Sequence, residues 1–207
     1  MSDSIHPPKQ KRSEETLASL LAATIRVLDE AGLDGATIPR IATLAGVAPA
    51  SVYRRFVSKD ALIRAALLSM LRNSQAQGPS LARGETLPQA ARRLMALLFQ
   101  QYRTHPRLLR ALSRFMDTDQ DAAFVSEART IVAANLELLI EPLLVYRPEI
   151  SHGDPRAALR FALLQALTSI EAIALESYSL WHIAVAGTDE ELAGQFADGF
   201  VAYLTRR

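Results

Sequence analysis

Apolar residues recur along most of this chain at intervals of three and four positions, the spacing that places them on one face of an α-helix. The first such stretch runs through Leu17, Leu20, Leu21, Leu28 and Ala31. Strict alternation of apolar and polar residues, which indicates a half-buried strand, is not seen in competition with this pattern. The chain is therefore predicted to be all-α, with about nine helices.

Capping residues and helix breakers predict where these helices begin and end. The predicted helices span, to within a few residues, 14–31, 38–45, 49–56, 59–75, 87–104, 106–115, 119–144, 155–186 and 189–205. Thr86 with Gln89, and Thr188 with Glu191, have the spacing of capping boxes. Pro142 is expected to kink or end its helix. Residues 147–154 form a predicted loop before the longest helix, which would be ~45 Å long at ~1.5 Å per residue.

The segment from Asn73 to Glu85 is polar and is interrupted by Gly78, Pro79 and Gly84. Such a composition indicates a boundary, which we place near residue 80. The predicted division is therefore a first domain at 1–58 with a basic N-terminal arm, a connecting helix and loop at 59–80, and a second domain at 81–207.

Two short predicted helices joined by a tight turn occupy residues 37–56. In the first, Ile38, Ile41 and Leu44 are expected to face inward. Gly46 supplies the left-handed conformation that the turn demands, with Val47 filling the space between the helices. In the second, Val52 and Phe56 are expected to face the core. Their neighbours would then face outward: Ala50, Ser51, Tyr53, Arg54 and Arg55.

The formal net charge is +1, yet the basic residues are not spread evenly. Between Gly35 and Lys59 the chain has Arg40, Arg54, Arg55 and Lys59 and no acidic residue. A local basic patch of this kind suits phosphate binding. Charge alone also allows a merely solvated face. A DNA-packaging protein would be strongly basic throughout, and the net charge argues against that class.

An ordered set of residues at this spacing is similar to the DNA-binding domain of the TetR family of transcriptional regulators. The matching residues are Ala31-Gly32, Thr37-Ile38, Ile41-Ala42, Ala45-Gly46-Val47, Ser51-Val52-Tyr53, Phe56 and Ser58-Lys59-Asp60-Ala61-Leu62. The resemblance covers residues 13–62. It implies an N-terminal three-helix DNA-binding domain followed by a larger helical domain that binds an effector and forms the dimer.

The resemblance also implies roles for matching positions. Phosphates would be contacted by Thr37, Arg40, Tyr53 and Lys59. Bases would be approached by Ala50, Ser51 and Arg54 or Arg55, over a helix that Pro49 opens. The family usually has Ser or Thr where this chain has Ala48, and the lost cap should cost ~1 kcal/mol.

The last two predicted helices are apolar on more than one side, which favours burial on all sides. In TetR-like proteins they form a four-helix dimer interface, and we expect a homodimer that reads a palindromic operator. Part of each helix must also serve the core within the chain. The expected interface residues are Leu163, Leu167, Ile170, Leu192, Phe196 and Phe200.

An effector pocket would lie among the helices from Thr86 to Trp181. Residues of suitable character are Met95, Phe99, Tyr102, Phe115, Tyr178 and Trp181, although side chains of this kind are more often plain core. Glu171 interrupts an apolar run and needs a partner if it is buried. That partner is either a ligand or an arginine of the same chain.

The remaining signals exclude several classes. Cysteine is absent and His6, His105, His152 and His182 are scattered, so we expect neither a metal nor a cofactor. No secretory signal is visible, and Arg160, Gln165 and Glu171 make residues 157–175 a buried helix, so we expect a cytoplasmic protein without a membrane span. Enzyme motifs are missing, although a helical enzyme with converging carboxylates is an alternative. We therefore predict a repressor that a small, largely apolar ligand releases from duplex DNA.

Overall fold

The computed structural model describes residues 9–74, 85–176 and 178–206, and within these ranges every regular element is a helix. The described elements are α1 (Lys9–Gly35), α2 (Ile38–Ala45), α3 (Pro49–Tyr53), α4 (Lys59–Ser74), α5 (Leu87–Thr104), α6 (Pro106–Thr118), α7 (Ala122–Leu143), the 3₁₀-helix η2 (Leu144–Glu149), α8 (Pro155–Leu175), α9 (Leu180–Ala184) and α10 (Asp189–Thr205). The all-α prediction is confirmed. The predicted boundary near residue 80 lies outside the described residues.

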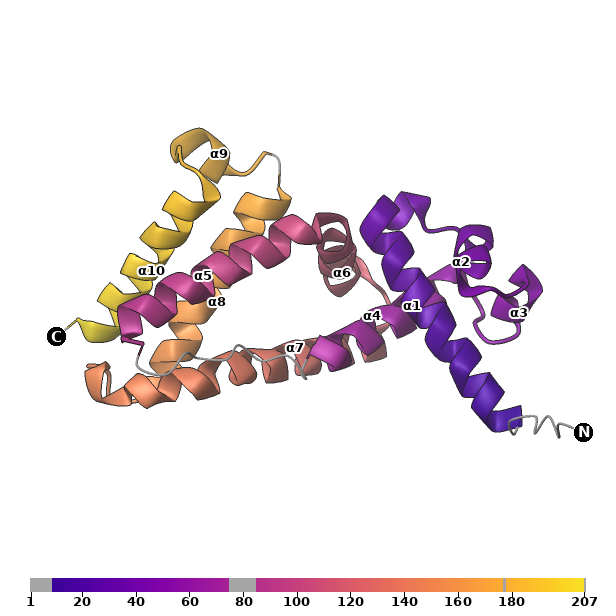
Figure 1. Ribbon diagram of the computed structural model, residues 1–207, viewed down its shortest axis with the longest axis horizontal. Coiled ribbons are helices and arrows are strands. Elements are labelled where there is room, and N and C mark those ends of the chain that lie inside the picture. The colour runs from indigo at the N-terminus through magenta and orange to yellow at the C-terminus, as the bar shows by residue number, and fades with distance from the viewer. Residues whose placement is uncertain (1–8, 75–84, 177, 207) are drawn as a thin grey trace, which may run out of the picture.

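Two apolar cores organise these helices, at opposite ends of an elongated molecule (Figure 1). The first core is formed by the four helices α1, α2, α3 and α4, together with α6 and the first half of α7. The second core joins α5, the end of α7, η2, α8 and α10. Helices α6 and α7 therefore connect the N-terminal helices to the rest of the chain. The predicted division at 1–58, 59–80 and 81–207 stays a prediction.

Helix α1 begins earlier than predicted. It starts at Lys9, so Ser13 lies within it, and the described part of the basic arm, from Lys9 onward, is helical. Gly32 ends the regular turns as expected, because its φ of 65° and ψ of −168° are not helical. A further turn then brings the chain to Gly35.

Three other boundaries also differ from the prediction. Helix α6 continues to Thr118, and α7 begins at Ala122 because the Asp121 carboxylate accepts a hydrogen bond from the Phe124 N–H. Helix α7 ends at Leu143, one residue after Pro142, and the backbone tightens into η2. The predicted loop at 147–154 is thus helical up to Glu149.

The predicted helix 155–186 is two helices. Helix α8 ends at Leu175, and the short α9 follows a break. Donors from other helices satisfy the last carbonyls of α8: Arg110 Nε lies 2.8 Å from the Leu175 oxygen, and Arg103 Nη1 lies 3.5 Å from the Ala174 oxygen. These contacts replace part of the bonding that another helical turn would supply. Residue spacing alone does not reveal such a stop.

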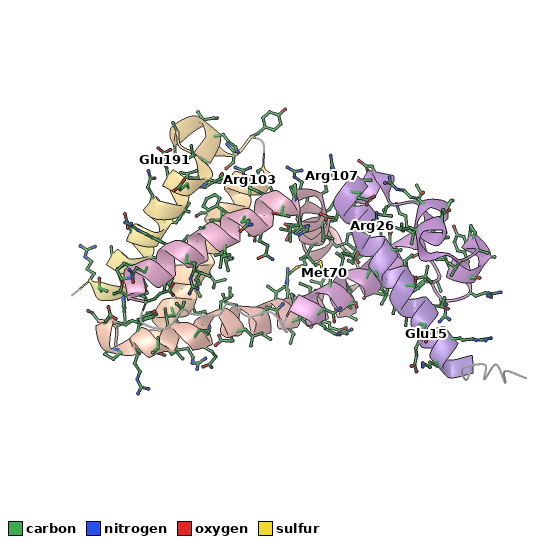
Figure 2. The ribbon with its side chains drawn as sticks, in the orientation of Figure 1. Glu15, Arg26, Met70, Arg103, Arg107 and Glu191 are labelled. Atoms are coloured by element: carbon green, nitrogen blue, oxygen red, sulfur yellow. The ribbon has the colours of Figure 1, made fainter. Side chains whose placement is uncertain are left out.

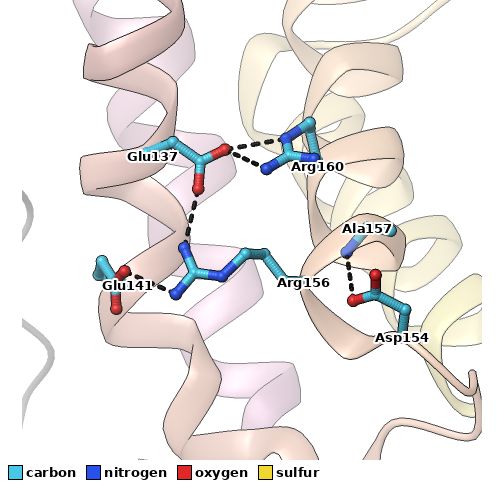
Figure 3. Close-up of polar contacts among 6 residues, drawn as sticks. All are labelled: Glu137, Glu141, Asp154, Arg156, Ala157 and Arg160. Atoms are coloured by element: carbon cyan, nitrogen blue, oxygen red, sulfur yellow. Dashed lines mark hydrogen bonds and ion pairs between the residues drawn. The ribbon is translucent and has the colours of Figure 1, made fainter.

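Helix α8 is long and apolar enough to cross a membrane by length and composition, but half of its apolar window is buried inside the protein. Its charged residues bind α7 (Figure 3). Glu137 accepts hydrogen bonds from Arg160 and Arg156, at 2.6 Å and 2.8 Å at the closest. The hydrogen bond from Arg160 contributes most to holding the pKa of Glu137 below its usual value. Of the three polar residues that interrupt this segment in the sequence, Arg160 thus belongs to an ion-pair network between α7 and α8.

Candidate nucleic-acid interface

Helix α2 has the predicted bounds, because local signals determine both ends. Thr37 Oγ1 accepts a hydrogen bond from the Arg40 N–H at 3.4 Å, and Pro39 lies in the first turn, where a missing N–H costs nothing. Gly46 has a φ of 70° and a ψ of 31°, the left-handed conformation expected of it. The turn after α2 therefore depends on this glycine.

One residue of α2 does not face the way we expected. Ile38 and Ile41 are buried, but Leu44 is 40% exposed. Ala42 and Ala45 instead continue the inward face, since they lie four and seven residues after Ile38. The prediction for Leu44 was wrong because a step of six residues turns it well away from Ile38.

Helix α3 is shorter than predicted and is exposed on most of its surface. It ends at Tyr53, and Arg54 and Arg55 lie in a turn beyond it. Val52 is fully buried and Phe56 packs against the first core, as expected, whereas Tyr53 is 60% exposed. No side chain caps its first turn, where Ala48 has an extended backbone. Ala48 therefore occupies the capping position without a side chain that can cap, as the sequence indicated.

The two arginines after α3 are held in different ways. Arg54 Nη2 donates to Ser51 Oγ at 2.8 Å, which keeps both side chains together on the exposed surface. Arg55 Nη2 donates to Ser13 Oγ at 3.0 Å, which directs it toward α1. Ser13 directly precedes the predicted first helix, and nothing in the local sequence indicates this contact. Only the fold brings residues 42 positions apart together.

Arg40 and Lys59 lie on the same N-terminal unit as α3. Arg40 forms an ion pair with Glu30 of α1 at 3.3 Å, a partner that the sequence did not reveal. Lys59 is the first residue of α4, where Ser58 Oγ accepts a hydrogen bond from the Ala61 N–H. The side chains of Thr37, Pro49, Ala50 and Lys59 are exposed. These positions are therefore open to a partner in the structure as it stands.

The predicted effector residues do not form one group. Met95 and Phe99 are buried in the second core, and Tyr102 and Trp181 pack against it. Phe115 belongs to the first core instead, and Tyr178 is 96% exposed. Phe115 and Tyr178 therefore do not line one pocket with the other four residues. Tyr178 is displaced because α8 ends before it.

Phe196 and Glu171 connect the remaining members of that group. Phe196 lies 6.0 Å from Phe99 and 5.5 Å from Trp181, measured between ring centroids. Burial, with a smaller contribution from the charge of Glu171, raises the pKa of Tyr102. Within the described part of the chain, Glu171 has no ion pair with an arginine.

Four of the six expected interface residues are buried in the chain's own core: Leu163, Ile170, Leu192 and Phe200. The second core of the single chain already covers these side chains, and their expected part in a dimer interface stays a prediction. Leu167 and Phe196 are half-buried against the same core. The exposed apolar residues of α8 are instead Phe161, at 50%, and Leu164, at 45%. Phe161 lies 5.3 Å from the ring of Tyr203 on α10.

Two hollows differ greatly in size. A gap between α5 and α7 near Leu94 and Leu139 measures only about 10 Å³, enough for no more than a water molecule. An open cleft beside the end of α8 measures about 310 Å³. Its walls are Arg103, Arg110, Ile173, Ala174, Glu176 and His182. Of these, sequence reasoning had singled out only His182, as one of four scattered histidines.

The two short helices α2 and α3, joined by the turn at Gly46, define a helix-turn-helix protein. The sequence model of the family described as "Bacterial regulatory proteins, tetR family" matches residues 20–66, which include both helices. The chain thus matches this family over its N-terminal helices, from α1 into α4.

Curated relatives match over the same region. The HTH-type transcriptional regulators BetI of Burkholderia thailandensis and of Burkholderia cenocepacia are each 38% identical over 66 residues, which is 32% of this chain and 34% of the relative. The chain thus spans about a third of the length of the curated relatives it matches.

Solved structures extend the likeness to the whole fold. A tetR-family transcriptional regulator from Streptomyces coelicolor has a TM-score of 0.67 at 19% identity, over 92% of this chain and 80% of that one. A putative TetR-family regulator from Mesorhizobium loti has a TM-score of 0.64 at 22% identity, over 96% and 98%. The helical second domain therefore has the fold of these proteins as well.

Proposed function

We propose that this protein is a sequence-specific DNA-binding transcriptional regulator, and that it acts as a repressor in the cytoplasm. The observation that carries the proposal is the exposed α3, in which small residues, Ala50 and Ser51, follow Pro49 in the first turn and two arginines follow the end of the helix. A helix with small residues at its N-terminal end can approach base edges closely in the major groove. No acidic residue occurs between Gly35 and Lys59 to oppose this approach.

The proposed contacts follow from how each side chain is held. Arg54, kept beside Ser51, would read a guanine edge through its guanidinium group. Lys59 would bind a phosphate at the start of α4, where backbone N–H groups and the helix dipole add to its charge. Thr37, Tyr53 and Arg40 would bind neighbouring phosphates, Arg40 by exchanging its partner Glu30 for DNA.

We further propose that two copies bind together and that a small, largely apolar ligand releases them from the operator. The exposed Phe161 and Leu164 on α8, next to Tyr203 on α10, give a second copy an apolar surface to cover. A ligand can release DNA if it prefers the state that does not bind DNA by a few kcal/mol. A solved protein with this fold, at a TM-score of 0.58 and 18% identity, is described as the flavonoid-responsive regulator FrrA.

The direct test replaces both arginines that follow α3. Arg54→Ala with Arg55→Ala should weaken binding to an operator duplex by roughly a hundredfold, because an arginine that reads a base supplies up to about 3 kcal/mol of contact energy. Fluorescence anisotropy with labelled duplex measures this, and far-ultraviolet circular dichroism checks that the variant remains helical.

Arg92→Ala is the matched control, because Arg92 is exposed on α5 and pairs with Asp198. It should leave operator binding unchanged. Wild-type affinity in the double variant would contradict the placement of the reading helix.

A further inference from the structure

The open cleft of about 310 Å³ lies where the ends of α5 and α8 meet α6 and α9. Figure 2 labels Arg103 at this end of α5. The volume is at the lower end of the range for sites that bind small molecules. Its wall combines apolar groups, Ile173 and Ala174, with Arg103, Arg110 and His182. The wall therefore offers apolar contact and positive charge together.

The two guanidinium groups in this wall are not equivalent. Arg103 donates from Nε and Nη2 to the Asp189 carboxylate, each at 2.8 Å, and this hydrogen-bonded pair raises the pKa of Arg103. Its charge is therefore matched within the protein. Arg110 uses Nε for the Leu175 carbonyl, and in the described part of the chain its two terminal nitrogens have no hydrogen-bond partner. Those nitrogens can bind a carboxylate in a bidentate manner.

Capping α8 does not by itself account for Arg110. One N–H is enough to satisfy the Leu175 carbonyl, and lysine or a water molecule serves helix ends equally well. Arg110 is exposed, so the outer edge of its planar fork is open to solvent and to a ligand in the cleft, as in an acid-binding group. Glu176 in the same wall repels negative charge, and Arg110 can offset that repulsion for one carboxylate. A ligand with a single acidic group therefore fits this wall better than a ligand with two.

We propose that this cleft binds a small organic monoacid, with its carboxylate on Arg110 and its apolar part on Ile173 and Ala174. The proposal rests on the proposed function and deepens it, because it assigns a site and a chemical class to the effector. A monoacid of this kind is still a largely apolar ligand.

Arg110 also lies on the helix that joins the cleft to the N-terminal unit. The opposite face of α6 buries Leu108 and Ala111 in the first core. At its start, Arg107 Nη1 donates to the Glu30 carbonyl of α1 at 2.8 Å, and His105 Nδ1 lies 2.8 Å from the Asp29 carboxylate. Figure 2 labels Arg107 beside α1. A ligand that moves α6 therefore acts on the unit that carries α2 and α3.

The test is a binding measurement by calorimetry on the full chain. The probes are benzoate, phenylacetate and cinnamate, each compared with its neutral amide. At least one acid should bind to the wild-type protein at millimolar concentration or below, and more tightly than its amide. Arg110→Gln should weaken that acid by about tenfold, the effect of losing a charge-assisted pair, and leave the amide unchanged.

Two further variants separate binding from folding. Arg110→Lys keeps the positive charge but lacks the paired N–H donors of the guanidinium group. This variant should keep part of the preference for the acid over the amide. Arg114→Gln makes the same substitution one turn further along α6, outside the residues that line the cleft, and should bind as the wild type does. Thermal unfolding of each variant shows whether it folds.

The proposal is overturned if no acid of the set binds, or if the preference for acid over amide survives in the folded Arg110→Gln variant. Operator binding in the absence of any acid tests the proposed function separately. If the protein binds its operator but no acid, the cleft proposal fails and the regulator proposal stands. If acids bind through Arg110 but no operator is found, the regulator proposal fails and the acid-binding cleft stands.

Discussion

Ala48 is the residue at which this chain departs most clearly from the expected helix-turn-helix pattern. Its φ of −71° and ψ of 143° are those of a capping residue, yet its methyl group cannot accept a hydrogen bond from the first turn of α3. The backbone conformation is retained without the interaction that usually favours it. Pro49, with its restricted φ, offsets part of this loss.

Ala48→Ser should therefore raise the free energy of unfolding by about 1 kcal/mol, because the hydroxyl can accept an N–H of α3. Urea unfolding followed by circular dichroism measures the difference. Ala50→Ser, inside the same helix, is the control and should give no gain, since serine is a poorer helix former than alanine. A gain of equal size in both variants would contradict the capping explanation.

Single residues also show why sequence patterns predict some side-chain positions and not others. Val52 was correctly predicted as buried, because its spacing of four residues from Phe56 places both on one face of the helix. The neighbouring Tyr53 lies on another face and is exposed. Leu44 was placed wrongly because its apolar character was given more weight than its angle around α2. The contacts of Arg55 with Ser13 and of Arg40 with Glu30 join separate helices, so no local pattern contains them.

At the scale of helices, α4 is tied to the junction of α6 and α7 by Arg64. Arg64 Nε donates to the largely buried Asp119 carboxylate at 2.9 Å. Burial acts to raise the pKa of Asp119, but the hydrogen bonds from Arg64 and from the Asp121 N–H outweigh it, and the pKa lies below its usual value. This ion pair therefore stabilises the folded state while Asp119 is ionised.

Asp119→Asn should lower the free energy of unfolding by roughly 1–3 kcal/mol at neutral pH. Because the pKa is lowered on folding, the contribution is full above the unfolded value of about 3.9 and is lost as the pH falls through the folded value. Urea unfolding of both proteins over a pH series should show the curves converging in acid.

Asp117→Asn, at an exposed position on α6, provides the comparison and should have little effect at any pH. A constant difference between wild type and Asp119→Asn down to low pH would show that the charge is not responsible.

Helix boundaries were predicted well where the signal is local. Thr37 and Gly46 define α2, and the capping box of Thr188 and Glu191 begins α10, in agreement with the sequence. The end of α8 was missed because arginines from α5 and α6 determine it. This end is also where the cleft lies, so the candidate effector site could not be located from residue spacing.

At the scale of the whole molecule, the exposed aromatic surface of α8 and α10 is where a second copy would bind. Phe161→Glu should raise the dissociation constant of the dimer by about thirtyfold, the effect expected for a central aromatic residue in an interface. Light scattering over a range of protein concentrations measures this. The operator should bind less tightly as well, since two half-sites would no longer be occupied together.

Val132→Glu places the same charge on an exposed apolar position of α7, and it should leave the dimer intact. An unchanged dimer in Phe161→Glu would place the interface elsewhere.

The central claim, that the protein reads DNA sequence through α3, is tested most directly by selection from a random pool of duplex DNA. After several rounds, we predict enrichment of an inverted repeat whose half-site centres lie ~34 Å or a multiple of that apart. The Arg54→Ala, Arg55→Ala variant should enrich no sequence under the same conditions. Failure of the wild-type protein to enrich any sequence over non-specific DNA would contradict the account.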